Sequence, residues 1–343
     1  MDLRGILHAA AHINRDQIAA GPKVRQAASR TANFFIAAVR TFLLVGLSFV
    51  ILYPILYMLS VSFREPAELY DLTVVWIPRT LTLKNFHYVF FESGIAFLPK
   101  ILGGFEAGAL LRSFMLSLIC TVLQVFTCSL AGYGFARFRF VGRGALFAVA
   151  LFTLIVPPQS INMPLYVNYV GFTKFTSEIL GGEGIQIINT LTPMALPALL
   201  GTGIRAGLFV YLFRQFYRNM PSELEEAAYL DGCGPISAYF RIMLVNAGPI
   251  LLISFLFSFV WYWNDYLNVS LFFNKSRPMS IELSNFWNYL NHQKLPDGSA
   301  ISRSLMGVYV QVAALLFIAP VLLLYIALQR FFIRSIVTAG IVG

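Results

Sequence analysis

Six long apolar stretches dominate this sequence, and they restrict the possible fold more than any other feature. They lie near residues 41–63, 113–133, 144–166, 191–213, 249–272 and 305–328. A helix of about 20 apolar residues can cross a hydrocarbon core about 30 Å thick. Only 12% of the 343 residues are charged and 58% are hydrophobic, whereas soluble domains average about 25% charged residues. We therefore predict an all-α integral membrane protein with six transmembrane helices.

The distribution of lysine and arginine predicts how these helices are oriented. With six spans, both termini lie on one side of the membrane, together with the loops 134–143 and 214–248. This side carries more lysine and arginine than the other, and the short loop 134–143 holds three arginines and no acid. Short cytoplasmic loops are enriched in positive charge. We predict that both termini are cytoplasmic, that residues 1–40 form a basic cytoplasmic tail, and that 41–343 form the six-span domain.

Residue types that carry catalysis or hold metals form no recognisable pattern. The sequence has no G-x-x-x-x-G-K-[ST] phosphate loop, and Gly181-Gly182-Glu183-Gly184 lacks the lysine that such a loop needs. The cysteines fit neither a disulfide framework nor a metal site, and the histidines are scattered. These residues are Cys120, Cys128, Cys233, His8, His12, His87 and His292. We expect a chain that is not an enzyme by itself and that binds no cofactor or metal directly.

Polar side chains inside the predicted spans are candidates for a translocation path. Such groups are costly in hydrocarbon and usually face a cavity or another helix. Gln159 and Asn162 follow Pro157-Pro158, which must interrupt the third span because each proline removes a backbone donor. The two side chains either line a translocation cavity or pack at the kink.

Three further candidates lie in the fourth and fifth spans. Asn264 and Asp265 are far along the fifth span, where they either line the outer gate or lie at the headgroups. Arg205 lies inside the fourth span. It pairs with an acid on a partner subunit, contacts the transported molecule, or extends toward the headgroups, and the sequence does not rank these roles.

The loop 214–248 has the strongest local signals. Ser222 and Glu225 form an S-x-x-E capping box, which predicts that a helix begins at Ser222. Gly232 is placed to end that helix, because glycine adopts the left-handed conformation without a steric penalty. Gly234-Pro235 then begins a second helix that leads into the fifth span. So short a helix is marginal alone and must pack against another surface.

This loop resembles the EAA loop of binding-protein-dependent ABC importer permeases. The matching residues are Glu226, Ala227, Ala228, Asp231 and Gly232, followed by Ile242-Met243-Leu244. The resemblance implies that these first five residues belong to a coupling helix, which lies in a cleft of the ATP-hydrolysing subunit. Two positions depart from the usual pattern: Val245 stands where proline is usual, and Cys233 where alanine is common.

Other stretches extend the resemblance over most of the chain beyond residue 40. They are similar to the carbohydrate-uptake branch, and to its smaller maltose-transporter permease. These stretches are Trp76-Ile77-Pro78, Thr82-Leu83-Lys84-Asn85-Phe86, Gly132-Tyr133-Gly134-Phe135-Ala136-Arg137, Met163-Pro164-Leu165, Phe213-Arg214-Gln215-Phe216, Trp263-Asn264-Asp265-Tyr266 and Gln329-Arg330-Phe331-Phe332. The C-terminus, Ala339-Gly340-Ile341-Val342-Gly343, lacks the lysine that is common there in the family. The implied fold is the transmembrane domain of a type I ABC importer.

The resemblance also implies partners and a location. The implied partners are a second, non-identical permease, two ATPase subunits that carry ATP and Mg, an extracytoplasmic binding protein and membrane lipid, with no nucleic acid. The implied location is the prokaryotic cytoplasmic membrane, and the implied cargo is a sugar or oligosaccharide. The alternatives are the same machinery with another polar solute, such as glycerol phosphate esters, or an ion-coupled secondary transporter. That last class needs an acidic relay in the membrane, for which Asp265 is the one marginal candidate.

Overall fold

The computed structural model describes residues 22–71, 76–93, 108–295 and 298–340. Most of the predicted basic tail, with His8 and His12, and the last three residues lie outside this part. The chain divides into two units, Met1–Ser60 and Val61–Gly343. The described residues of the first unit belong to the helix α2 (Pro22–Ser62). The apolar side chains of α2 from Phe34 to Leu59 are largely exposed.

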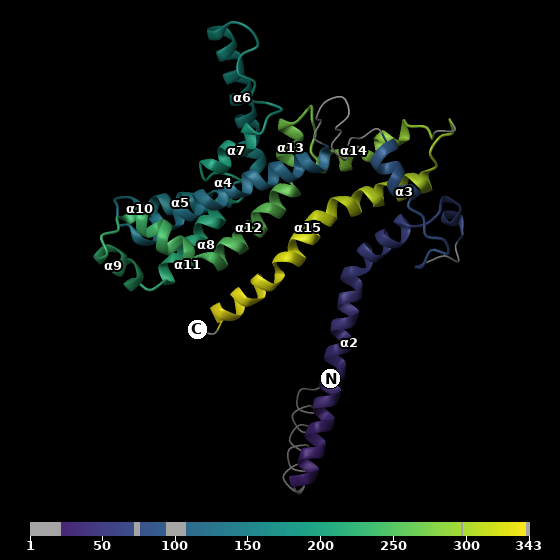
Figure 1. Cartoon of the computed structure of the whole chain (residues 1–343), viewed down its shortest axis with the longest axis horizontal. Coiled ribbons are helices and arrows are strands. Elements are labelled where there is room, and N and C mark those ends of the chain that lie inside the picture. Colours follow the sequence, from purple (N-terminus) through teal and green to yellow (C-terminus); the bar gives the residue numbers. More distant parts are fainter. Residues whose placement is uncertain (1–21, 72–75, 94–107, 296–297, 341–343) are drawn as a thin grey trace, which may run out of the picture. The chain divides into compact units, whose positions relative to one another are not determined.

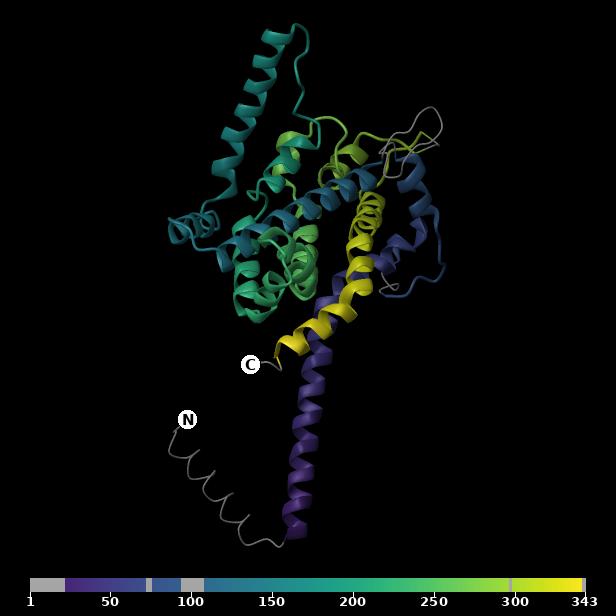
Figure 2. The same ribbon diagram turned by 60° about the vertical axis from the view of Figure 1, so that its left-hand side comes forward.

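Helices make up the second unit, and no strand occurs in its described residues (Figures 1 and 2). Two isolated bridges join Arg64 to Leu81 and Lys294 to Ala300. The elements follow in the order η1 (Pro66–Tyr70), α3 (Lys84–His87), η2 (Tyr88–Glu92), α4 (Ala109–Arg137), α5 (Arg143–Phe152), α6 (Pro158–Leu180), α7 (Thr192–Leu199), α8 (Ala206–Asn219), α9 (Glu223–Leu230), α10 (Pro235–Ala238), η3 (Tyr239–Met243), α11 (Leu244–Asn246), α12 (Gly248–Trp263), α13 (Leu267–Phe272), α14 (Met279–Asn291) and α15 (Arg303–Gly340).

The helix α4 is the central element of this unit. It packs along α8 and α12, and also contacts α7 and α14. Gly132 allows the close approach of α8, because a Cβ atom there would collide with the Cβ of Phe213 and lie 2.9 Å from the backbone nitrogen of Arg214. Small residues let two helix backbones approach closely in a membrane protein. The motif glycine is therefore a packing residue between α4 and α8.

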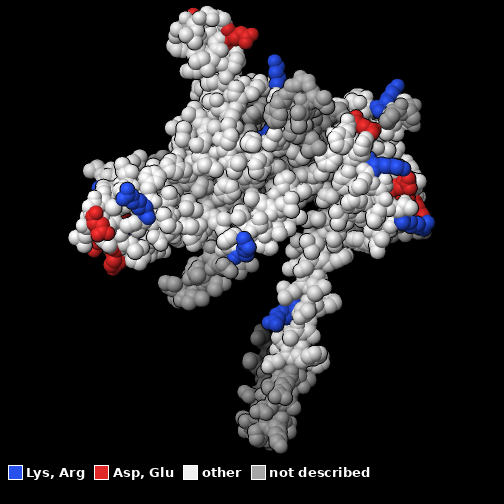
Figure 3. Space-filling model, viewed as in Figure 1, with Lys and Arg blue, Asp and Glu red and all other residues white. Residues whose placement is uncertain are grey.

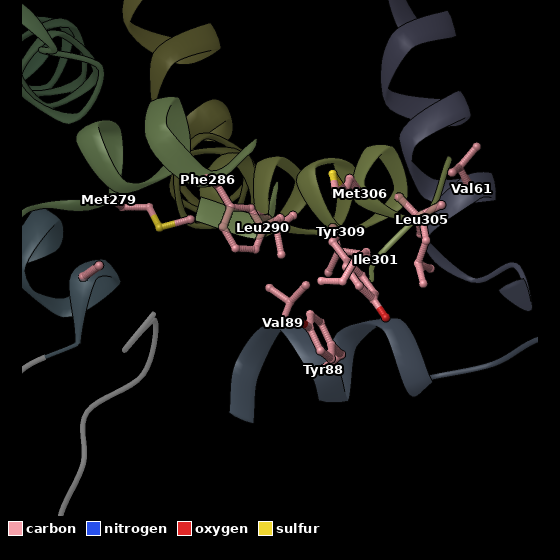
Figure 4. Packing of buried hydrophobic residues seen from close by; sticks show 14 residues of the cluster. Val61, Tyr88, Val89, Met279, Phe286, Leu290, Ile301, Leu305, Met306 and Tyr309 are labelled. Carbon is pink, nitrogen blue, oxygen red and sulfur yellow. The ribbon is translucent and has the colours of Figure 1, made fainter. Parts of the chain in front are cut away.

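A separate apolar cluster joins α3, η2, α14 and α15 (Figure 4). Its rings include Tyr88 and Tyr309, which stack with their centroids 4.1 Å apart. Val89, Phe286 and Leu290 are fully buried beside them. Offset aromatic stacking adds to the apolar burial, so this cluster fixes the short elements at 84–92 against the long helix α15.

Three helices in the described residues are long and apolar enough to cross a membrane: Asn33–Ser62, Ala109–Arg137 and Arg303–Phe331. The second and third contain the predicted spans at 113–133 and 305–328, and the first covers all but the last residue of 41–63. A fourth appears if Pro235–Asn246 and Gly248–Trp263 are counted together, although a 78° bend separates them. The count of six spans and the side on which the termini lie remain predictions.

The other predicted spans are interrupted in the structure. The stretch 144–166 is divided between α5 and α6, and the break falls before Pro158, as the two prolines predicted. The stretch 191–213 is not one helix, because the chain leaves α7 at Leu199 and begins α8 at Ala206. The stretch 249–272 likewise consists of α12 followed by α13. Predicting 191–213 and 249–272 each as one continuous helix was therefore wrong.

Charged side chains are unevenly distributed over the second unit. On the face shown in Figure 3, acidic and basic groups gather around α9 and again around η1 and α3. The surface over α4, α12 and most of α15 is largely uncharged in this view. Uncharged surface of this kind is compatible with contact to hydrocarbon.

Candidate functional site

The loop after α8 contains the short helix that the sequence predicted. The helix α9 begins at Glu223, with Ser222 at its N-cap, and ends at Leu230. Gly232 follows with φ of 81°, in the left-handed region. Its amide donates to the carbonyl of Tyr229 over 3.1 Å, and the amide of Cys233 donates to that of Ala228 over 2.9 Å. These two bonds define a Schellman motif, which confirms Gly232 as the helix stop.

The predicted capping box does not form. The side chain of Ser222 makes no capping hydrogen bond, and its backbone is itself helical. Glu225 instead points into the protein, where it is only 7% exposed. Its Oε1 accepts a hydrogen bond of 2.6 Å from the hydroxyl of Tyr133, and its Oε2 lies 3.0 Å from Nε of Arg137. A tertiary contact with α4 has therefore replaced the local cap.

Arg137 joins this contact to the end of α8. One of its terminal nitrogens donates to the backbone carbonyl of Met220 over 2.7 Å, just before α9 begins. A buried charge is stable in a protein when it is paired and hydrogen-bonded. Because Tyr133 and Arg137 both belong to the last turns of α4, they attach α9 and the residue before it to the central helix.

A group of buried tyrosines surrounds the attachment point. The ring of Tyr133 lies 5.6 Å from that of Tyr217 and 5.0 Å from that of Tyr239, between centroids. The hydroxyl of Tyr239 donates to Oγ of Ser129 over 3.0 Å, and Ser129 and Tyr217 share a hydrogen bond of 2.7 Å. The residues come from α4, α8 and η3. Their buried hydroxyl groups are thus satisfied within one network.

The residues expected to contact an ATPase lie mainly on the surface. Glu226, Ala227, Asp231 and Gly232 are exposed, whereas Ala228 is buried where α9 packs on α10 and η3. Exposed apolar side chains extend this surface: Leu230 is 89% exposed and Ile236, on α10, is 76% exposed. The helix therefore has a buried side fixed to the protein and an open side with acidic and apolar groups.

The second predicted helix begins where expected, but it is not a regular α-helix along its whole length. Gly234 and Pro235 start α10, which continues through the π-helical turn η3 and α11. The helix stops at Asn246, and α12 leaves at an angle of 78°. Prolines at the first turn of a helix need no backbone donor, and Pro249 occupies this position in α12. The connection to the predicted fifth span is therefore bent at Ala247.

The expected path residues do not form one cluster in the described residues. Gln159 is exposed and Asn162 half-buried at the start of α6, which packs against α13. Asn264 donates to the carbonyl of Val260 over 2.9 Å at the end of α12. Asp265 accepts from the backbone and side-chain nitrogens of Asn268, over 3.2 and 2.8 Å. Their role in a translocation path remains a prediction.

Arg205 lies at the break between α7 and α8 rather than inside a continuous helix. Its φ of 53° places it in the left-handed region directly before α8. The guanidinium carbon is 5.1 Å from the ring centroid of Trp261, which is within the range of a cation–π interaction. The exposed charge therefore rests against α12 of the same chain.

Sequence reasoning missed the residues that make this break possible. The side chain of Gln124 donates to the carbonyl of Ile204 over 2.8 Å, and its oxygen accepts from the hydroxyl of Tyr262 over 2.6 Å. The backbone nitrogen of Ile204 donates to that same hydroxyl over 3.4 Å. Irregular backbone at membrane depth needs such partners inside the protein. Gly201-Thr202-Gly203, within an apolar run, was the available signal.

The sequence is similar to those of known membrane transport proteins. Residues 128–338 match the family described as binding-protein-dependent transport system inner membrane component. The arabinooligosaccharides transport system permease protein AraQ of Halalkalibacterium halodurans is 29% identical over 302 residues, covering 87% of this chain and 93% of its own. The trehalose transport system permease protein SugB of Mycobacterium tuberculosis is 26% identical over 317 residues, covering 92% and 99%.

A solved structure supports the fold as well. A crystal structure of a bacterial ABC transporter involved in the import of the acidic polysaccharide alginate has a chain with a TM-score of 0.61. It is 18% identical, and the match covers 88% of this chain and 98% of that one. The family match spans more than half of the sequence and includes α9 with its attachment to α4. This chain therefore belongs to the family of inner membrane components of binding-protein-dependent transport systems, and it is an ABC transporter permease.

Proposed function

We propose that this chain is the transmembrane permease of an ATP-driven importer, and that α9 couples it to an ATPase subunit. The observation that carries the proposal is the two-sided geometry of α9. Glu225 is fixed to α4 through Tyr133 and Arg137, while Glu226 and Ala227 remain exposed. A rigid connection of this kind transmits movement from a docked partner to the central helix. ATP and Mg bind to the partner subunits, and this chain contributes no catalytic group.

A sugar or oligosaccharide is the proposed cargo. The support comes from the relatives, whose names specify arabino-oligosaccharides and trehalose. An extracytoplasmic binding protein delivers the cargo to the outer end of the path. Glycerol phosphate esters remain the alternative cargo for the same machinery.

The proposed assembly contains two different permeases. This chain has one EAA-type helix, so it offers one docking position, whereas ATP hydrolysis in such transporters needs a pair of ATPase subunits. A second, non-identical permease then supplies the other position. The complex lies in the cytoplasmic membrane of a prokaryote, with α9 on the cytoplasmic side.

Uptake of radiolabelled solutes by a deletion strain tests the function. The strain is complemented with the wild-type gene and supplied with a panel of oligosaccharides, monosaccharides and glycerol phosphate esters. We expect saturable uptake of at least one sugar, lost in the deletion strain and retained after collapse of the proton gradient while ATP is maintained. Uptake that stops with the proton gradient at constant ATP would identify a secondary transporter instead.

Cysteine accessibility tests the orientation separately. In a Cys233→Ser background, single cysteines replace the exposed residues Leu230 and Ile77, which lie on opposite predicted sides. An impermeant thiol reagent should label position 77 in intact cells and position 230 only after permeabilisation. The reverse pattern would place α9 outside the cell and exclude its coupling role.

A further inference from the structure

Three arginines lie together at the corner between α4 and α5, beside α8. Arg143 begins α5 and donates from a terminal nitrogen to the carbonyl of Phe138 over 3.0 Å. Arg214 of α8 holds its guanidinium carbon 4.1 Å from the ring centroid of Phe147. Arg218 follows one turn later on α8, and its side chain is exposed. Two of the three guanidinium groups are thus held in place by this chain.

No carboxylate balances these charges within the described part of the chain. Burial lowers the pKa of Arg214 below its usual value, and the positive charges of Arg218 and Arg143 lower it further. Arg137, at the end of α4, is already paired with Glu225. Like charges at short range are unfavourable unless an anion lies between them. The corner is therefore an unbalanced cationic site.

Exposed apolar side chains adjoin the three arginines. Val141 is fully exposed, and Phe140 is partly exposed beside it. Leu146, Val149 and Phe152 are exposed along α5, at intervals of three residues. Residues three apart lie on one face of a helix, so α5 presents an apolar strip that begins at the cationic corner.

We infer that Arg143, Arg214 and Arg218 bind the phosphate headgroup of an anionic phospholipid, whose acyl chains lie along the exposed face of α5. The chain belongs to a membrane family, and α4 is a candidate span that ends at this corner, which places the corner near the headgroups. A soluble acidic partner would match the charges but leave the fully exposed Val141 and the apolar strip in water. Charge and apolar surface together fit a lipid. The inference does not depend on the identity of the cargo.

Lipid titration of the purified full-length chain in neutral detergent tests this site, with bound lipid counted by native mass spectrometry. The probes are phosphatidylglycerol and phosphatidylcholine. Each arginine near a membrane surface strengthens binding of anionic lipid about fivefold, so Arg143→Gln with Arg218→Gln should weaken phosphatidylglycerol binding about 25-fold. Phosphatidylcholine binding should not change. Arg143→Lys with Arg218→Lys keeps the charges and should retain most of the affinity.

Lys174→Gln with Lys275→Gln is the matched control, because it removes two exposed charges elsewhere. Elution volume and thermal midpoint establish that each variant is folded. The inference is overturned if the Arg143→Gln/Arg218→Gln variant binds phosphatidylglycerol as tightly as the wild type. It is also overturned if the Lys174→Gln/Lys275→Gln control loses as much affinity as that variant. Displacement of the lipid by millimolar inorganic phosphate would also overturn it, since that result identifies a site for soluble anions.

Discussion

The hydroxyl of Tyr133, in the last two turns of α4, donates a hydrogen bond of 2.6 Å to the carboxylate of Glu225 on α9. The two residues are 92 positions apart in the sequence. Because α4 packs along α8 and α12, a displacement of α9 that preserves this bond must also displace the central helix. The bond therefore connects the exposed surface of α9 to the helices that form the body of the permease.

The first prediction concerns this connection. Tyr133→Phe removes the donor to a buried carboxylate, and Glu225→Gln removes the charge that pairs with Arg137. A hydrogen bond to a charged group typically contributes about 1.5–3 kcal/mol, and we expect a loss of that order in each variant. The midpoint of thermal unfolding should fall, and uptake should decrease more than the amount of protein in the membrane.

Two controls separate this effect from a general loss of polar groups. Glu223→Gln changes an exposed acid on the same helix, and Tyr325→Phe changes an exposed tyrosine on α15. Both should behave like the wild type. In the double variant Tyr133→Phe/Glu225→Gln, the losses should be less than additive, because the two residues act on the same contact. Strict additivity would show that the bond does not link them in the working transporter.

The second prediction compares two glycines of the same motif on α4. A Cβ atom at Gly132 would collide with Phe213 and Arg214 of α8, whereas one at Gly134 has Phe138 Cδ2 as its nearest neighbour, at 4.0 Å. Overpacking typically costs about 1–3 kcal/mol. Gly132→Ala should therefore lower the thermal midpoint of the detergent-solubilised protein. Gly134→Ala should leave it unchanged or raise it, because alanine is the better helix former. Equal thermal midpoints in the Gly132→Ala and Gly134→Ala variants would contradict the packing described for α4 and α8.

The turn after α9 could be predicted from sequence, and the contacts of α9 could not. Gly232 is required by its own backbone conformation, a positive φ. Such a local requirement can be recognised from the sequence of the segment alone. Glu225 also has a local interpretation, as the second member of a capping box. In the structure that carboxylate contacts Tyr133 and Arg137 instead of capping α9. Their positions in the sequence gave no sign of this pairing, because it depends on how α4 packs.

Of the interrupted spans, too, one break could be predicted from the sequence and another could not. Pro157-Pro158 marks its break directly, because proline cannot donate to a helix. The break at 200–205 contains only two glycines as a signal, and glycine is common in transmembrane helices. What allows the chain to unwind there is the buried Gln124 and Tyr262 on α4 and α12. A count of apolar residues cannot detect partners supplied by other helices.

The third prediction tests those partners. Gln124→Leu removes both the donor to the half-buried carbonyl of Ile204 and the acceptor for the buried hydroxyl of Tyr262. A buried polar group that loses its partner costs about 1–3 kcal/mol, so we expect a marked fall in the thermal midpoint. Tyr262→Phe should produce a smaller fall, and Tyr266→Phe, at an exposed tyrosine, should produce none. An unchanged midpoint in Gln124→Leu would mean that water or another group satisfies the break.

The last prediction concerns coupling, and it compares the same substitution at two glycines of one loop. Gly232→Val forces a β-branched residue into a backbone with φ of 81°, whereas Gly234 is extended, with φ of −78°, and neither position has a neighbour within 4 Å of an added Cβ. The first change should cost about 1–2 kcal/mol locally and distort the end of α9, and the second should be tolerated. We expect Gly232→Val to abolish uptake in cells that contain normal amounts of inserted protein, and to weaken copurification of the ATPase or uncouple hydrolysis from the binding protein. Glu226→Lys, which reverses an exposed charge, should have the same effect, while Glu223→Lys should be milder. Full uptake by both Gly232→Val and Glu226→Lys at normal expression would show that α9 is a passive connector.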